Sequence, residues 1–181
     1  MKKGCKNPLL DSFPVALCDN IRIKRCRLVQ DELYRGKMAS KRRYFYGVRV
    51  QILATSSGIP LEFCILPGAC SDLQGLAELA LDLPEDAELF VDGGYNFYEW
   101  EDYLREVEEL RLQVPRRINS KREREPWLEI YKSLMRKYIE TTIGEIAKLF
   151  PKKIHATNLD GFVLKIALFL FAYQVDKAFI K

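Results

Sequence analysis

Three acidic residues stand where carboxylates are useful for chemistry. Asp11 lies inside an apolar run, Asp92 follows the short apolar run 88–91 and precedes two glycines, and Glu140 projects from a long helical segment. Carboxylates on adjacent strands, joined by one from a helix, can hold two Mg²⁺ or Mn²⁺ ions, which oxygen ligands favour over zinc. Such ions activate a water or a 3′-hydroxyl for attack on a phosphodiester. The three acids therefore predict metal-dependent phosphoryl transfer.

Each aspartate also has a structural interpretation. Asp11 before Ser12 fits a turn or a cap, and Asp92-Gly93 is a common turn pair. Asp11 stands between Leu10 and Phe13, where a buried acid without a partner is costly. A metal ion would remove that cost, so Asp11 favours the catalytic interpretation.

Arg136 precedes Glu140 by one helical turn, so the two side chains share a face. They form either a surface ion pair or a site in which the arginine contacts the scissile phosphate beside the metal. His155 is the single histidine. With no second imidazole nearby, we interpret it as a loop residue rather than a ligand or a base.

The apolar pattern predicts three strands, a helix, a strand, a helix, a strand, a long helix and a closing helix. The strands are expected at 9–17 (broken by Pro14), 44–54, 61–66, 88–91 and 110–114, and residues 19–43 as a basic loop. The helices are expected at about 72–81 after an N-cap at Ser71, 98–109, 127–150 and 162–179, the last one buried. Core positions of the long helix are expected at Trp127, Ile130, Leu134, Tyr138 and Ile146. This order predicts an α/β fold with a mixed five-stranded sheet flanked by helices, as in the RNase H-like fold.

Charge is strongly segregated along the chain. Residues 1–49 hold 13 Lys and Arg against 4 Asp and Glu, residues 50–110 hold 1 against 14, and residues 111–153 hold 12 against 5. Two basic blocks separated by an acidic one could fold into one polyanion-binding face, or could remain ordinary solvated surfaces. The charge pattern alone leaves both interpretations open.

The length of 181 residues favours a single compact domain. The five cysteines form no CxxC pair, which argues against a zinc knuckle and a disulfide framework. The most apolar stretch, 162–173, is too short to cross a bilayer and contains a lysine. We therefore expect a cytoplasmic, nucleoid-associated protein with no membrane contact.

Four strings in the sequence resemble insertion-sequence transposases of the DDE superfamily, particularly the nine-eighty-two group. They are DSFPVALCDNIRIKRCRLV, YRGKMASKRRYFYGVRV, VDGGYNFYEWEDYL and RKYIETTIGEIAKLFPKKIHATNLDGFVLKIALFLFAY. The resemblance covers nearly the whole chain. It implies an RNase H-like catalytic domain that cuts and transfers DNA strands with two Mg²⁺ or Mn²⁺ ions, its partners being the element ends and the target DNA, with a homodimer as a further possibility.

The resemblance implies specific site residues. The first aspartate falls on Asp11, the second on Asp92 and the glutamate on Glu140, with Arg136 as the helix arginine. Related proteins carry a tyrosine and a lysine on the same helix, but here those positions are Ser133 and Ala147, with Tyr131 and Lys148 nearby. The residues expected to contact DNA are Arg42, Arg43, Tyr95, Arg116, Arg117 and Lys148.

Full-length relatives carry an N-terminal helical region that recognises the element ends, and this chain begins about ten residues before Asp11. We therefore expect residues 1–181 to be a catalytic domain from a longer transposase. Two alternatives remain open: an RNase H-like nuclease or resolvase, and a truncated non-catalytic DNA-binding remnant.

Overall fold

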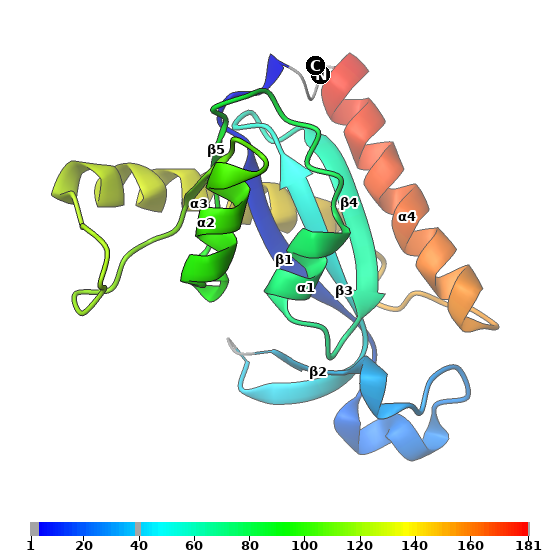
Figure 1. Cartoon of the computed structure of the whole chain (residues 1–181). Helices are drawn as coiled ribbons and strands as arrows, with labels where there is room; N and C mark the ends of the chain where they lie inside the picture. Colours follow the sequence, from blue (N-terminus) through cyan, green and yellow to red (C-terminus); the bar gives the residue numbers. More distant parts are fainter. Residues whose placement is uncertain (1–3, 39–40, 181) are drawn as a thin grey trace. The chain divides into compact units, whose positions relative to one another are not determined.

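A computed structural model describes residues 4–38 and 41–180 (Figure 1). The chain forms two compact units. Unit 1 comprises Met1–Asp11, Ile52–Glu62 and Ala80–Thr142, and unit 2 comprises Ser12–Gln51, Phe63–Leu79 and Ile143–Lys181. The boundaries after residues 11, 51 and 62 fall inside strands and the boundary after residue 142 falls inside a helix, so some elements contribute residues to both units. The prediction of a mixed α/β fold is confirmed.

Apart from one additional strand, β2, the strands and α-helices follow the predicted order. The strands are β1 (Leu9–Asp19), β2 (Arg35–Met38), β3 (Arg43–Ala54), β4 (Pro60–Pro67), β5 (Glu88–Phe90) and β6 (Arg111–Gln113). The α-helices are α1 (Asp72–Glu78), α2 (Tyr98–Glu106), α3 (Pro126–Leu149) and α4 (Leu159–Val175). Short 3-10 helices cover Asn20–Arg25, Glu32–Tyr34 and Gly93–Tyr95, and a short π-helix covers Asp176–Ile180.

Unit 1 is built on parallel pairing between short strands. β5 pairs with the start of β1 through Leu9 opposite Phe90, and with β6 along its whole length. Leu9 and Leu89 are fully buried, and Leu104 of α2 is nearly so. Parallel strands buried on both faces need continuous apolar sequence, which explains the ELFV run before Asp92.

Unit 2 contains the antiparallel pair β2–β3, with Arg35 opposite Tyr46 and Met38 opposite Arg43. β2 lies in the segment that the sequence predicted to be a loop. Among residues 4–38 and 41–180 the sheet therefore has six strands rather than five, in the order β2-β3-β1-β5-β6 with β4 paired to β3. The strand was missed because RGKM has no apolar alternation, and its pairing with β3 supplies what its own sequence lacks. Pro14 does not break β1, which runs unbroken from Leu9 to Asp19.

α1 starts where the sequence predicts. The Ser71 side chain accepts a hydrogen bond from the backbone N–H of Gln74, and the Gln74 side chain accepts one from the backbone N–H of Ser71. This capping box satisfies two N–H groups that the first helical turn leaves unpaired. The helix ends at Glu78, three residues before the predicted end.

The predicted core face of α3 is wrong in its first half. Trp127, Ile130, Leu134 and Tyr138 are between 47% and 65% exposed, whereas Ile146 is fully buried as predicted. The face that packs carries Lys132, Met135 and Ile139 instead. A hydrogen bond from Lys132 to the carbonyl of Val114, which follows β6, helps to hold the helix on that face. The stripe that carries Trp127 therefore faces solvent.

α4 is also only partly buried. Phe162, Ile166, Leu170 and Tyr173 form its buried face, while Leu164, Leu168 and Phe171 are more than half exposed. The prediction of a buried closing helix therefore holds for one face of it. Within residues 4–38 and 41–180, no helix combines the length and the apolar character that crossing a bilayer would require.

Candidate active site in unit 1

Parallel pairing sets Asp11 and Asp92 level with each other. Leu9 of β1 pairs with Phe90 of β5, and each aspartate follows its paired residue by two positions. Neighbouring strands lie roughly 4.8 Å apart. Two acids 81 positions apart in sequence are thus delivered by adjacent chain segments at the carboxyl end of β5.

Asp92 is fixed by the turn that follows β5. It caps the 3-10 helix Gly93–Tyr95: its Oδ1 accepts from the Gly93 N–H at 2.6 Å, and its carbonyl oxygen accepts from the Tyr95 N–H at 3.1 Å. The same Oδ1 lies 3.2 Å from Nη1 of Arg136. Asp92 therefore has both the capping role that its sequence allows and a contact with the helix arginine.

Arg136 joins Asp92 to Glu140. Its Nε donates to Oε1 of Glu140 at 2.8 Å while Nη1 contacts Asp92. Burial alone would lower the pKa of Arg136, but the negative charges of Asp92, Glu140 and Asp11 more than offset this and raise the pKa above its ordinary value. All three acids thus act electrostatically on one guanidinium, and we call these four residues the acidic cluster.

Polar contacts hold α3 in the position that brings Arg136 to Asp92. The Lys132 ammonium is almost fully buried and donates to the Val114 carbonyl and to the Glu129 carboxylate, both at 3.0 Å. The second Glu129 oxygen accepts from the Arg116 backbone N–H at 2.9 Å. One turn beyond Lys132, Arg136 then faces the end of β5, because residues four apart share a helix face.

The acidic cluster suits a divalent cation in its donor chemistry. Carboxylate oxygens are the ligands that Mg²⁺ and Mn²⁺ take in proteins, and Asp92 and Glu140 are 36% and 51% exposed. Among the residues that the structure describes, no three Asp, Glu, His or Cys side chains form a ready metal-binding group. Arg136 instead supplies the positive charge that contacts Asp92 and Glu140.

The residues expected to contact DNA lie in both units and differ in exposure. In unit 1, Arg117 is exposed, whereas Tyr95 is fully buried and the Arg116 guanidinium is only 8% exposed. Neither Tyr95 nor Arg116 therefore offers an exposed side chain to a partner. In unit 2, Arg42 and Lys148 are exposed, and Arg43 is also exposed and forms an ion pair with Asp19 at 3.2 Å.

Glu101 is a site-supporting residue that the sequence did not reveal. It is 3% exposed and accepts from Nη1 of Arg116 at 2.8 Å and from Nη1 of Arg122 at 2.9 Å. The Arg122 guanidinium also lies over the Tyr98 ring, 4.7 Å from its centroid. These contacts fasten the loop 115–125, which leads into α3, to α2. In sequence Glu101 is one of 14 acids in the block 50–110, and nothing marks it as buried.

The family comparison covers the acidic cluster and the elements that carry it. A family model described as a transposase DDE domain matches residues 3–157. The chain belongs to the transposase DDE domain family. Searches of curated proteins and of solved structures give no significant match. The family match confirms the resemblance inferred from the sequence, and the DDE domain includes Asp11, Asp92, Arg136 and Glu140.

Proposed function

We propose that this chain cuts DNA strands and joins them during transposition of an insertion sequence, with the acidic cluster as its catalytic centre and an RNase H-like arrangement of strands. The proposal is carried by one observation: Asp92 and Glu140 form ion pairs with the guanidinium of Arg136, and the pairing of β1 with β5 brings Asp11 to the adjacent chain segment. Membership of the DDE family supplies the substrate class.

Asp11, Asp92 and Glu140 would hold two Mg²⁺ or Mn²⁺ ions. When bound, such ions lower the pKa of a coordinated water or 3′-hydroxyl and stabilise the leaving oxygen of the phosphodiester. Arg136 has a separate role in this proposal. A guanidinium carries five N–H donors, and the two ion pairs engage Nε and Nη1. We assign its remaining donors to the oxygens of the scissile phosphate, where planar bidentate contacts are favourable.

The first test is cleavage by a matched pair of variants. Glu140→Gln should reduce Mg²⁺-dependent cleavage of duplex DNA by at least a hundredfold and leave DNA binding within about twofold of the parent chain. The control is Glu108→Gln, which removes the charge of another exposed acid of unit 1 and should cleave normally. Equal cleavage by the Glu140 variant and the parent chain would remove Glu140 from the mechanism.

A second test separates transposition from the two alternatives. Supplied with a pre-cleaved DNA end bearing a 3′-OH and a target duplex, the chain should give strand-transfer product, whereas hydrolysis alone would favour a nuclease or resolvase.

Mn²⁺ titration adds a readout that does not need activity. Binding should be detectable in the parent chain and weaker in Asp92→Asn, and absence of binding in both would favour a non-catalytic DNA-binding remnant.

A further inference from the structure

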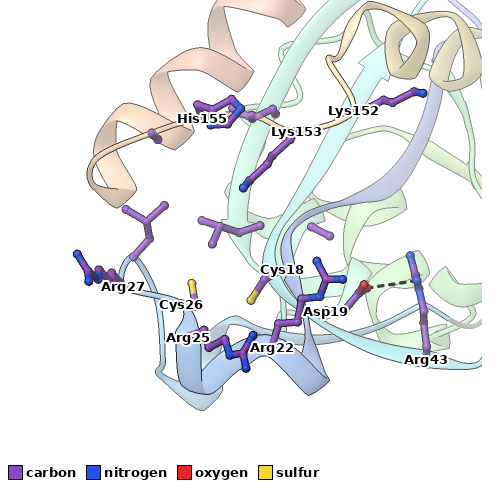
Figure 2. Close-up of a pocket in the computed structure, with 15 residues that line it drawn as sticks. Cys18, Asp19, Arg22, Arg25, Cys26, Arg27, Arg43, Lys152, Lys153 and His155 are labelled. Carbon is purple, nitrogen blue, oxygen red and sulfur yellow. Dashed lines mark ion pairs between the residues drawn. The ribbon is translucent and has the colours of Figure 1, made fainter.

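Unit 2 contains an open cavity that plays no part in the acidic cluster (Figure 2). Its volume is about 620 Å³. One part of the lining comes from the end of β1, the 3-10 helix after it, residues 26–28 and the start of β3, and the other part comes from the segment 152–156 before α4. The charged lining residues are Asp19, Arg22, Arg25, Arg27, Arg43, Lys152 and Lys153, with His155 beside them. We call this the basic cavity.

The charge of the basic cavity is poorly compensated. Six Lys and Arg side chains line it against one acid, Asp19, and that acid is paired with Arg43. Among the described residues, Arg25, Lys152 and Lys153 have no carboxylate within ion-pair distance, and all three are exposed. Like charges held together repel one another, so this arrangement costs stability unless an anion binds.

The basic cavity unites the two basic blocks of the sequence. Arg22, Arg25 and Arg27 belong to the block 1–49, while Lys152 and Lys153 end the block 111–153. Figure 2 shows Arg22, Arg25 and Arg27 on one side of the cavity and Lys152 and Lys153 on the other. Of the two interpretations that the charge pattern left open, folding favours a polyanion-binding face over separate solvated surfaces.

The other residues of the lining indicate which chemical groups of a ligand the basic cavity can bind. Burial raises the pKa of the Cys18 thiol to about 11, with the neighbouring Cys26 adding to the effect, so Cys18 is protonated at neutral pH and a poor nucleophile or metal ligand. Among the described lining residues there is no Phe, Tyr or Trp on which a base could stack. The side chains therefore suit phosphates rather than bases.

We propose that the basic cavity binds the phosphodiester backbone of DNA without reading its sequence, as a contact separate from the acidic cluster. The proposal rests on the proposed function only in taking DNA as the substrate. Phosphate contacts of this kind position a nucleic acid and set affinity and salt dependence, but carry no base specificity. The basic cavity would thus hold the DNA while the acidic cluster acts on it.

The test compares two triple variants that remove equal charge from exposed positions. The cavity variant is Arg25→Ala, Lys152→Ala and Lys153→Ala; the control variant changes Lys24, Lys41 and Arg105 to alanine, which are exposed and do not line the cavity. Each phosphate contact contributes about 0.9 to the slope of log affinity against log salt. The cavity variant should lose about 2 to 3 units of slope and bind a random-sequence duplex roughly a hundredfold more weakly at 0.1 M NaCl. The control variant should stay within a few-fold of the parent chain.

A footprint locates the contact within the folded parent chain. Acetylation of lysines with and without DNA, followed by mass spectrometry, should show protection of Lys152 and Lys153 and none of Lys24. Equal affinity losses in both triple variants, or equal protection of all three lysines, would overturn the proposal. A control duplex of scrambled sequence should bind equally, and strong preference for one sequence would also contradict backbone-only contact.

These readouts do not depend on catalysis. If the chain binds DNA through the basic cavity but neither cleaves nor transfers strands, the catalytic proposal fails while this one stands. If Glu140→Gln abolishes cleavage but the cavity variant binds DNA as tightly as the parent chain does, the basic-cavity proposal fails while the catalytic proposal stands. Neither variant should have a lower thermal midpoint than the parent chain, since the substituted side chains are exposed.

Discussion

Replacing Glu101 with alanine tests whether a buried ion-pair cluster holds the approach to α3. Glu101 is 3% exposed and Arg116 is 8% exposed, so Glu101→Ala would leave the Arg116 guanidinium buried without its carboxylate. Removing one partner of a buried pair costs about 3 to 5 kcal/mol. Arg122, at 32% exposure, can reach water and adds little to that cost.

The adjacent residue provides a matched control. Asp102 lies on the same helix, carries the same charge and pairs with Arg122, but it is 53% exposed. An exposed pair contributes about 1 kcal/mol or less, so Asp102→Ala should hardly change stability. The two variants therefore differ mainly in the burial of the carboxylate that is removed, while its charge, its helix and its partner Arg122 are the same.

Urea unfolding followed by tryptophan fluorescence measures both variants. With a slope of roughly 2 kcal/mol per molar urea, Glu101→Ala should lower the midpoint by about 1.5 to 2.5 M, and Asp102→Ala by less than about 0.5 M. Glu101→Gln, which keeps an acceptor for the two arginines, should fall between them and serves if the alanine variant does not fold. Equal midpoint shifts for Glu101→Ala and Asp102→Ala would refute the reasoning.

Two further predictions concern stability. Burial and a hydrogen bond to a carboxylate raise the pKa of Tyr173 to about 12 in the folded chain. In the unfolded chain a tyrosine ionises near pH 10. Between about pH 10 and 12 only the unfolded state loses this proton, so the free energy of unfolding falls as the pH rises. Tyr173→Phe should flatten that fall in urea midpoints measured across this range, and the exposed Tyr103→Phe should not. A Cβ on Gly47 would lie 2.3 Å from the Val15 carbonyl oxygen, whereas one on Gly144 in α3 meets nothing within 4 Å. Gly47→Ala should therefore lower the thermal midpoint sharply. Gly144→Ala should raise the midpoint, because alanine in a helix is more stable than glycine by about 1 kcal/mol. A higher midpoint for Gly47→Ala than for Gly144→Ala would contradict the packing.

Two parts of the acidic cluster, the turn at Asp92 and the pair Arg136 and Glu140, could be predicted because they depend on local patterns. ELFV followed by Asp92-Gly93 predicts a strand and a turn at its end, and the turn forms as expected. The spacing of Arg136 and Glu140 predicts their shared helix face, and their ion pair forms at 2.8 Å. Both features depend on residues that are close in sequence, and strand and helix periodicity determine which of these residues share a face.

Other features depend on long-range partners and escaped prediction. β2 forms because β3 offers it hydrogen bonds, and its four residues carry no strand pattern of their own. The packed face of α3 is chosen by Lys132 and by the Val114 carbonyl 18 positions away, against the preference of the exposed Trp127 stripe. Burial of a polar group is decided by its partners, which composition does not reveal.

The sequence by itself determined the family and the order of the strands and α-helices other than β2, because periodicity, turn residues and short motifs are local. Only the tertiary structure decided which charges meet. It placed Arg136 between Asp92 and Glu140, paired Arg116 with Glu101, and brought parts of the two basic blocks to one cavity. Electrostatic interactions depend on distance and burial, and both follow from packing between segments far apart in the chain.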